Sequence, residues 1–215
     1  MIKKEDIKII YKKLDKKYPK KFNGLNYNNT FELLIAVILS AQCTDIKVNK
    51  ITPKLFENHK TPSDLVELGK KNIKKIIRPC GLSNSKSKYI YKTSQMLIEE
   101  FDSKVPDNLK DLMKLSGVGR KTANVVLIEG FQIPRMPVDT HVFRVSNRIG
   151  IVDEKTVLKT ERKLMERVQK GFWIRLHHLL ISHGRATCKA RSPKCKTCII
   201  NDYCEYYKGV SDGKN

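Results

Sequence analysis

Apolar residues recur at helical spacing along almost the whole chain, and this periodicity constrains the fold more than any other feature. Ile7, Ile10 and Leu14 mark one face of a first helix, which Pro19 is expected to end. Residues 31–40 are apolar almost all round, as in a buried central helix. No segment of the sequence shows sustained alternation of period two between turn residues. The sequence therefore predicts an all-α fold.

Local signals predict several helix ends. Thr61 followed by Pro62 is typical of an N-cap and a first helical residue. Pro53 interrupts a helical stretch that begins after Asp45, so we expect that helix to break there. Residues 131–137 contain two prolines and are the best candidate for a domain boundary. Further helices are predicted at about 86–100, 108–115, 120–129, 139–148, 155–169 and 173–183, with glycines at expected helix ends: Gly81, Gly130, Gly150 and Gly184.

The net charge of the chain indicates what kind of partner it binds. The chain of 215 residues carries 43 Lys and Arg against 22 Asp and Glu, a formal net charge of +21. Such an excess favours a polyanionic partner such as nucleic acid. An AT-rich genome, which enriches lysine codons, could explain part of it, so charge alone does not prove a nucleic-acid partner.

Neither a targeting segment nor a membrane span is predicted. The N-terminus lacks the apolar core of a signal peptide. The longest apolar run, residues 33–39, is too short to cross a bilayer. We expect a cytoplasmic protein without membrane association.

A glycine-rich turn joins two predicted helices at residues 115–123. Gly117 and Gly119 permit positive φ and let the backbone approach a ligand closely. The free N–H groups that open the second helix can bind a phosphate. An ordinary helix–helix turn is the alternative. The residues that follow the turn favour a hairpin that holds DNA by its backbone: Arg120, Lys121 and Thr122.

Lys121 lies in the first turn of that second helix, where a lysine commonly contacts phosphate or is simply solvated. A lysine that acts as a nucleophile must be neutral, and keeping its amine neutral at pH 7 costs roughly 4.6 kcal/mol. A helix N-terminus supplies about 0.3–1 kcal/mol of this. Desolvation, neighbouring cations or proton removal by a carboxylate must supply the rest.

Asp139 lies where the helix predicted at 139–148 begins, and aspartate is a favoured N-cap. This structural role is one sufficient explanation. The other is catalytic, because a carboxylate here could assist proton removal from Lys121 or stabilise positive charge on a sugar. For His141, packing, phosphate contact and catalysis all remain open.

Four cysteines crowd into the segment 188–204 with the spacing C-x6-C-x2-C-x5-C: Cys188, Cys195, Cys198 and Cys204. In a reducing compartment they indicate a metal centre rather than disulfides. Structural zinc usually pairs two short C-x2-C knuckles, and only one is present here. All-cysteine ligation also holds iron–sulfur clusters. Spacing alone favours iron–sulfur over zinc only modestly.

The loop between the first two of these cysteines is basic. Lys189, Arg191 and Lys194 lie in it, and a metal that fixes both its ends would preorganise it for phosphates. Cys43 and Cys80 are far away in the sequence and are predicted to be core or near-surface thiols rather than ligands.

Together these motifs closely resemble the endonuclease III family of the helix–hairpin–helix DNA glycosylase superfamily. The resemblance runs from about Phe31 to Tyr206 and rests on LSAQ at 39–42, GLSNSK at 81–86, the hairpin, VDTH at 138–141 and the cysteine spacing. It implies a six-helix domain at about 22–132. It also implies a second domain, residues 1–21 with 133–215, that carries a [4Fe–4S] cluster. DNA would lie across the cleft between the two domains.

The resemblance further implies base excision repair of damaged double-stranded DNA. Lys121 would attack the anomeric carbon of an oxidised pyrimidine nucleotide and form a Schiff base. β-Elimination would then nick the strand 3′ to the abasic site, with Asp139 as the assisting carboxylate. Gln42 and Leu82 would fill the space left by the flipped nucleotide; their residue types alone indicate a helix-end polar residue and a core leucine.

The sequence leaves other functions open, both within the superfamily and outside it. Two sister groups, the adenine-mismatch and thymine-mismatch glycosylases, depart from the family pattern at the lysine position, so Lys121 favours the bifunctional glycosylase/lyase. A non-catalytic DNA-binding module, whose hairpin and metal loop only grip phosphates, is an alternative of another class. No unexplained apolar face remains in the pattern, so we expect a monomer that associates with the nucleoid through DNA.

Overall fold

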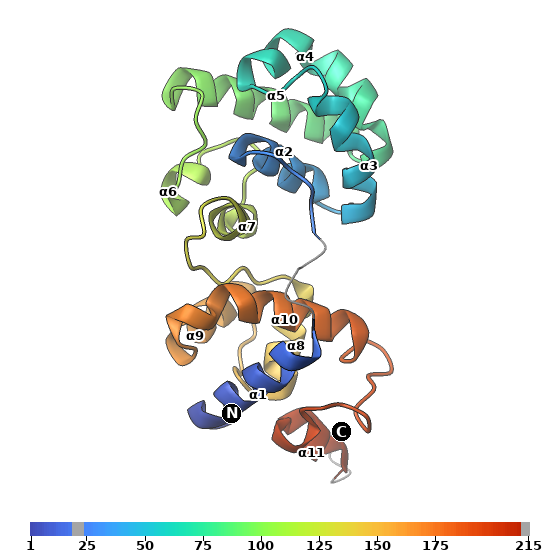
Figure 1. Ribbon diagram of the computed structural model, residues 1–215, viewed down its shortest axis with the longest axis vertical. Coiled ribbons are helices and arrows are strands. Elements are labelled where there is room, and N and C mark those ends of the chain that lie inside the picture. Colours follow the sequence, from blue (N-terminus) through green and yellow to red (C-terminus); the bar gives the residue numbers. More distant parts are fainter. Residues whose placement is uncertain (19–23, 212–215) are drawn as a thin grey trace. The chain divides into compact units, whose positions relative to one another are not determined.

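The computed structural model describes residues 1–18 and 24–211, and every regular element in those ranges is helical (Figure 1). The all-α prediction is therefore confirmed. No described helix is long and apolar enough to cross a bilayer. The α-helices are α1 (Lys4–Lys17), α2 (Thr30–Ser40), α3 (Asp45–Phe56), α4 (Pro62–Ile77), α5 (Ser83–Glu100), α6 (Leu109–Leu112), α7 (Arg120–Gly130), α8 (Thr140–Ile149), α9 (Val157–Arg167), α10 (Trp173–Ala186) and α11 (Glu205–Ser211). Short 3-10 turns are η1 (Arg78–Cys80), η2 (Lys170–Phe172) and η3 (Asn201–Tyr203).

The chain divides into two compact units. One contains Met1–Phe22 and Pro134–Asn215, and the other contains Asn23–Ile133. The division at Ile133 falls inside the segment 131–137 that the sequence marks as a boundary. The other boundary, and Pro19 as the expected end of the first helix, lie outside the described residues. The first helix ends at Lys17.

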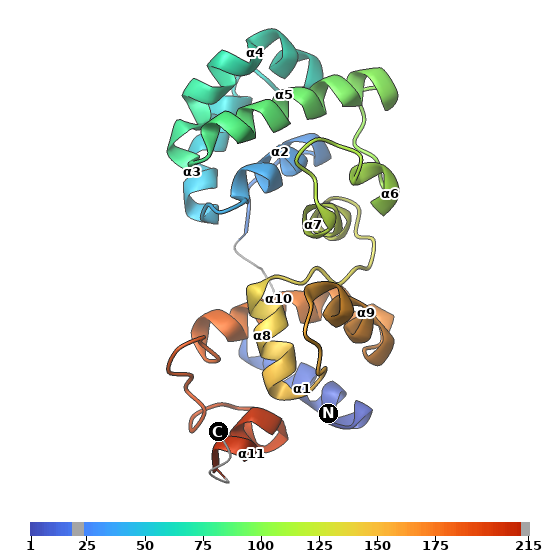
Figure 2. The same ribbon diagram turned by 180° about the vertical axis from the view of Figure 1, so that it is seen from behind.

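In the unit Asn23–Ile133, α2 is the centre of the core. Nearly all of its residues are buried, as its all-round apolar pattern predicts. It packs against α3, α5 and α7. Helices α4 and α5 lie side by side in both ribbon views (Figures 1 and 2). The buried Glu32 is satisfied locally, because its Oε2 accepts hydrogen bonds from the backbone and side-chain nitrogens of Asn28.

The start of α4 confirms the capping signal predicted at Thr61 and Pro62. Thr61 and Asp64 form a capping box at its start. Gly69, with φ +75°, divides the element by a kink into two helical stretches. Gly81 follows η1 with φ +68°.

The predicted break at Pro53 is wrong. Helix α3 continues through Pro53 to Phe56, and the Glu57 N–H bonds the Pro53 carbonyl at 2.9 Å. An interior proline costs about 3 kcal/mol. Burial of Leu55 and Phe56 against the core outweighs this cost, because it fixes the last turn in place.

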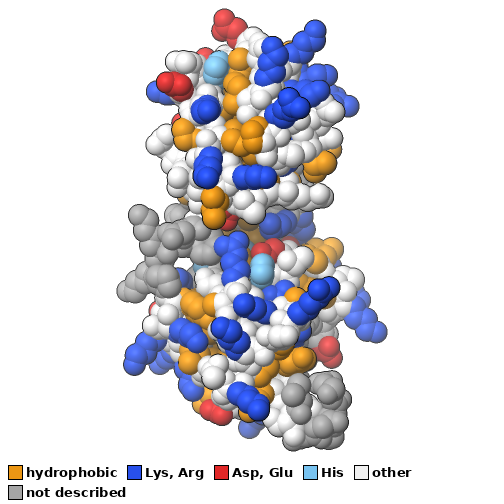
Figure 3. Space-filling view, turned by 90° about the vertical axis from the view of Figure 1, so that its right-hand side faces the viewer, with side chains coloured by type: hydrophobic (Ala, Val, Ile, Leu, Met, Phe, Trp, Pro, Cys, Tyr) orange, Lys and Arg blue, Asp and Glu red, His pale blue; other side chains and the backbone are white. Residues whose placement is uncertain are grey.

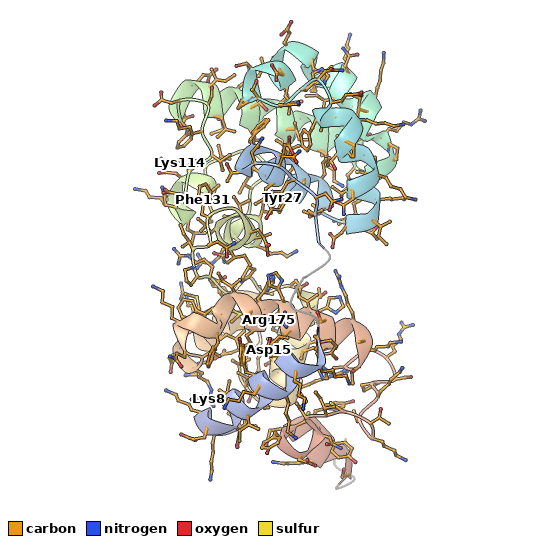
Figure 4. All side chains as sticks on the ribbon, in the orientation of Figure 1. Lys8, Asp15, Tyr27, Lys114, Phe131 and Arg175 are labelled. Carbon is orange, nitrogen blue, oxygen red and sulfur yellow. The ribbon has the colours of Figure 1, made fainter. Side chains whose placement is uncertain are left out.

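In the other unit, α1, α8 and α10 enclose a second apolar core. Ile7, Ile10 and Leu14 supply the face of α1 that the periodicity marks. Asp15 of α1 and Arg175 of α10 point toward each other (Figure 4), with Nε to Oδ1 at 2.6 Å.

The predicted helix end at Gly184 is also wrong, because α10 continues to Ala186. Instead Gly184 allows close packing, since a Cβ there would lie 3.0 Å from Nδ1 of His141 and 3.1 Å from Cγ2 of Val145 on α8. Gly130 and Gly150 do end helices, Gly150 in the left-handed conformation. The helix predicted at 108–115 is shorter, because the chain turns after Leu112 toward the hairpin.

Candidate active site and metal centre

The turn between α6 and α7 forms the predicted hairpin, and α5 anchors it. Thr93 Oγ1 donates a 2.7 Å hydrogen bond to the Ser116 carbonyl. Gly117 has φ +78°, and a Cβ there would lie 2.6 Å from Cγ of Tyr89. Gly119 has φ −84° and open space around its Cα. Only Gly117 therefore requires glycine for the fold, while Gly119 leaves the start of α7 accessible.

The start of α7 combines uncapped backbone donors with an exposed amine. Its N-cap is Gly119, so no side chain caps the helix. The N–H groups of its first turn have no acceptor within the helix and, with the helix dipole, favour an anion. Lys121 is exposed in this turn, and its side chain has no hydrogen bond or ion pair with a described residue of its own unit. The backbone N–H groups can therefore bind a phosphate, and the side chain of Lys121 is free to react beside it.

Asp139 is the N-cap of α8. Its Oδ1 accepts a 2.8 Å hydrogen bond from the Val142 N–H, and the side chain is only partly buried. The chain just before it is fixed, because Pro137 and Val138 are buried and the Pro137 carbonyl lies 2.8 Å from Nδ1 of His177. The N-cap role is thus real, and it holds the carboxylate in one orientation with Oδ2 unused by the cap.

His141 is half-buried beside Asp139. Its Nδ1 lies 3.1 Å from Nη2 of Arg144 and also against Gly184. Burial lowers the pKa of His141 below its usual value; Asp139 opposes this shift, while Arg144 reinforces it. His141 is therefore neutral at pH 7, and packing occupies one edge of its ring.

The four clustered cysteines line one cavity, together with apolar side chains such as Ile149 and Ile200. Each of these cysteines is partly buried. Nε2 of His183 lies 3.6 Å from Cys198 Sγ, and the Tyr18 hydroxyl lies 3.0 Å from Nδ1 of the same ring. Four thiol donors around one partly closed, mostly apolar space fit a group held entirely by thiolates.

The basic loop between the first two of these cysteines is fastened by α8. Arg148 donates to the Lys189 carbonyl at 2.7 Å and to the Ala190 carbonyl at 3.0 Å. Arg144 donates to the Cys188 carbonyl. The cationic side chains of Lys189, Arg191 and Lys194 remain exposed. One helix thus presents Asp139 at its start and supports the basic loop further along.

Gln42 and Leu82 each occupy an exposed turn with positive φ, +53° and +51°. Leu82 is 55% exposed, which rules out the core position that its residue type alone indicates. The ammonium of Lys86, which is 2% exposed, connects the two segments. Its Nζ donates to the Leu39 carbonyl at 2.8 Å and to the Cys80 carbonyl at 3.0 Å.

Lys86 and the two arginines of α8 were not recognised as site residues from the sequence. A signal exists for each. Lys86 lies four residues before the buried Ile90, so the amphipathic pattern places a charge on the core face of α5. Arg144 and Arg148 are four residues apart and therefore share one face of the helix that Asp139 caps.

Comparison with known proteins identifies the family. Residues 35–170 match the family model for HhH-GPD superfamily base excision DNA repair proteins, and residues 188–204 match the iron–sulfur binding domain of endonuclease III. The chain is 50% identical over 198 residues to endonuclease III of Rickettsia prowazekii (strain Madrid E), which covers 92% of this chain and 93% of that protein. The chain belongs to the endonuclease III family. It is also 47% identical over 201 residues to endonuclease III of Escherichia coli (strain K12), covering 94% and 95% of the two chains.

A solved structure supports the same assignment. The trapped covalent intermediate of an endonuclease III with DNA superposes with a TM-score of 0.91 at 42% identity, covering 98% of this chain and all of that one. As a member of the endonuclease III family, the chain is a base excision repair DNA glycosylase and lyase rather than a non-catalytic DNA-binding module. Its cofactor is a [4Fe–4S] cluster, which decides between iron–sulfur and zinc. The four cysteines that line one cavity are the type of ligand that this group takes.

Proposed function

We propose that this enzyme removes oxidised pyrimidines from duplex DNA and nicks the resulting abasic site, with Lys121 as the nucleophile. The observation that carries the proposal is the exposed amine of Lys121 beside the uncapped N–H groups of α7. The amine lies next to a site for the DNA backbone, and among the described residues of its unit no side chain competes for its nitrogen.

The chemistry requires the target nucleotide outside the base stack. Nζ of Lys121 attacks the anomeric carbon, and the bond to the base breaks with its electron pair leaving on the base. Loss of a proton and opening of the sugar give a Schiff base between Nζ and that carbon. Removal of a proton from the adjacent carbon then expels the 3′ phosphate by β-elimination. The covalent DNA intermediate of the related endonuclease III supports this route.

We assign Asp139 the assisting role. Its Oδ1 is committed to the Val142 N–H, so Oδ2 is the oxygen left to accept a proton or to stabilise the cationic sugar. The N-cap bond fixes the direction of the carboxylate before DNA binds. This fixation reduces the entropy that must be lost in the reaction.

Other residues contact the DNA or hold the iron–sulfur cluster in this proposal. We propose that Gln42 and Leu82 occupy the space vacated by the flipped nucleotide, and that Cys188, Cys195, Cys198 and Cys204 hold the cluster, whose binding fixes both ends of the basic loop. The enzyme acts on damaged double-stranded DNA as a monomer. The proposed contacts to the DNA backbone are Gly117, Gly119, Arg120, Thr122, His141, Lys189, Arg191 and Lys194.

Borohydride trapping tests the nucleophile. The enzyme mixed with duplex DNA containing thymine glycol should give a stable covalent adduct on reduction, whereas Lys121→Ala should give none. Lys110→Ala, at an exposed lysine of α6, is the control and should be trapped like the unmodified enzyme. An adduct that persists in Lys121→Ala would show that another amine attacks.

A further inference from the structure

Two cysteines outside the metal centre are in contact. Cys43 lies in the turn after α2, and Cys80 is the last residue of η1. Their thiols interact electrostatically, and Cys43 packs against the apolar cluster that contains Cys80. Helix α3, which follows Cys43, packs against η1. Cys80 is 3% exposed, whereas Cys43 is only partly buried and packs at the edge of the core.

The backbones that carry these thiols are fixed relative to each other. The buried ammonium of Lys86 bonds the carbonyl of Cys80 itself and that of Leu39, four residues before Cys43. The Cys43 N–H is bonded to the Ser40 carbonyl at 3.0 Å. The thiol contact is therefore part of an ordered junction between two turns.

We propose that Cys43 and Cys80 are a dithiol that hydroperoxides oxidise to a disulfide, which joins the turn that carries Gln42 to the turn that carries Leu82. Each of these residues neighbours one of the thiols: Gln42 directly precedes Cys43, and Leu82 lies two residues after Cys80. A covalent bond between the thiols would hold both exposed turns at a fixed separation.

The two thiols have unequal parts in this reaction. The sulfur of Cys43, the more exposed of the two, attacks the peroxide oxygen and becomes a sulfenic acid while water leaves. The sulfur of Cys80 then attacks that of Cys43, and a second water leaves. Two thiols and one hydrogen peroxide thus give one disulfide and two waters, the sulfurs losing two electrons. Burial raises the pKa of Cys80 to about 11, which disfavours its thiolate, so the first attack falls to Cys43; in the second step the Cys80 proton passes to the sulfenic hydroxyl, which leaves as water.

An effect on repair rests on the proposed function of Gln42 and Leu82. The Lys86 hydrogen bonds between the two segments can lengthen when the side chains enter a DNA stack, whereas a disulfide cannot, and both turns hold a residue with positive φ. The disulfide should therefore slow excision of a paired lesion. Excision should be affected less for a lesion in a single-nucleotide bulge, because the base there is already unstacked.

The test uses the cluster-loaded enzyme treated with hydrogen peroxide or with diamide, followed by non-reducing peptide mapping. We expect a Cys43–Cys80 peptide pair that lacks two hydrogens and separates on reduction, and no such pair in Cys43→Ser or Cys80→Ser. Visible absorbance confirms that the cluster is intact in every sample. Oxidation of Cys43 to a sulfinic acid or a mixed disulfide, without a bridge to Cys80, would overturn the proposal.

The effect of the disulfide on repair is measured separately, as the rate of excision. Excision of paired thymine glycol should fall on oxidation and recover with dithiothreitol, while Cys43→Ser should be insensitive. A bridge that forms without changing excision would refute the effect on repair. Failure of the reduced enzyme to excise any oxidised pyrimidine would refute the proposed function, and peptide mapping would still decide whether the dithiol exists.

Discussion

At the scale of single residues, Asp139 caps a helix and, in the proposed mechanism, also assists the reaction. One oxygen caps α8 through the Val142 N–H, and the other is not used by the cap. The sequence leaves the structural and the catalytic explanations as alternatives. The geometry makes the two explanations compatible, because the cap orients the carboxylate that the proposed mechanism uses.

Two substitutions separate these roles. Asp139→Asn keeps a good N-cap and removes the charge, so stability should change little while turnover falls strongly. Asp139→Ala loses both, and should also lower the free energy of unfolding by about 1 kcal/mol. Urea unfolding and single-turnover excision measure the two effects. Equal activity of the Asn variant and the unmodified enzyme would restrict Asp139 to capping.

Lys86 is a buried charged residue whose removal should lower the stability of the fold. Replacement by methionine keeps the stem but leaves the carbonyls of Leu39 and Cys80 without this donor. Unsatisfied buried acceptors cost about 1–3 kcal/mol, so the unfolding free energy should fall by that order. Lys88→Met, at an exposed position of the same helix, should change it by less than about 0.5 kcal/mol. Equal urea midpoints for the two variants would contradict this account.

At the scale of elements, the hairpin depends on two glycines for different reasons. Gly117 is required by its positive φ and by its contact with Tyr89 on α5. Gly119 has an ordinary backbone conformation and open surroundings, so glycine there serves to let a DNA phosphate approach the backbone in the proposed complex. The short α6 and the uncapped α7 then present backbone donors to solvent.

Alanine at each position should distinguish the two reasons. Gly117→Ala should destabilise the enzyme by more than about 1 kcal/mol, because a left-handed residue with a Cβ is strained and meets Tyr89. Gly119→Ala should leave stability nearly unchanged and weaken DNA binding. Thermal unfolding and duplex binding at fixed salt measure these effects. Equal losses of stability would show that Gly119 too is structural.

At the scale of the whole molecule, charge is the dominant property. The formal net charge is +21, and Figure 3 shows Lys and Arg side chains spread over the face in view with few acidic ones. DNA is the partner that this excess fits. Each phosphate neutralised releases counterions, so binding must weaken steeply with salt.

Salt titration of duplex binding makes this quantitative. If about five phosphates are neutralised, the log–log slope of affinity against salt should be near −4.5. Lys189→Ala or Lys194→Ala in the basic loop should each reduce the magnitude of the slope by about 0.9. Lys8→Ala, at an exposed lysine of α1 outside the proposed contacts, should leave it unchanged. Unchanged slopes in both loop variants would remove that loop from the DNA interface.

The sequence by itself determined the features that depend on neighbours along the chain. Helical periodicity predicts the apolar faces of α1 and α2, and Thr61 with Pro62 predicts the start of α4, because caps and helix faces are local. The spacing of the four cysteines indicates a metal centre for the same reason. The residues of the hairpin were likewise visible as one contiguous motif.

Only the tertiary structure decided the features that depend on packing between distant segments. Core burial carries α3 through Pro53, and close packing against His141 accounts for a glycine inside α10. The contact between Cys43 and Cys80, and the bond from Lys86 to both their segments, join residues that no local pattern relates. Such features follow from the free energy of the whole core, in which a local preference worth a few kcal/mol can be overruled.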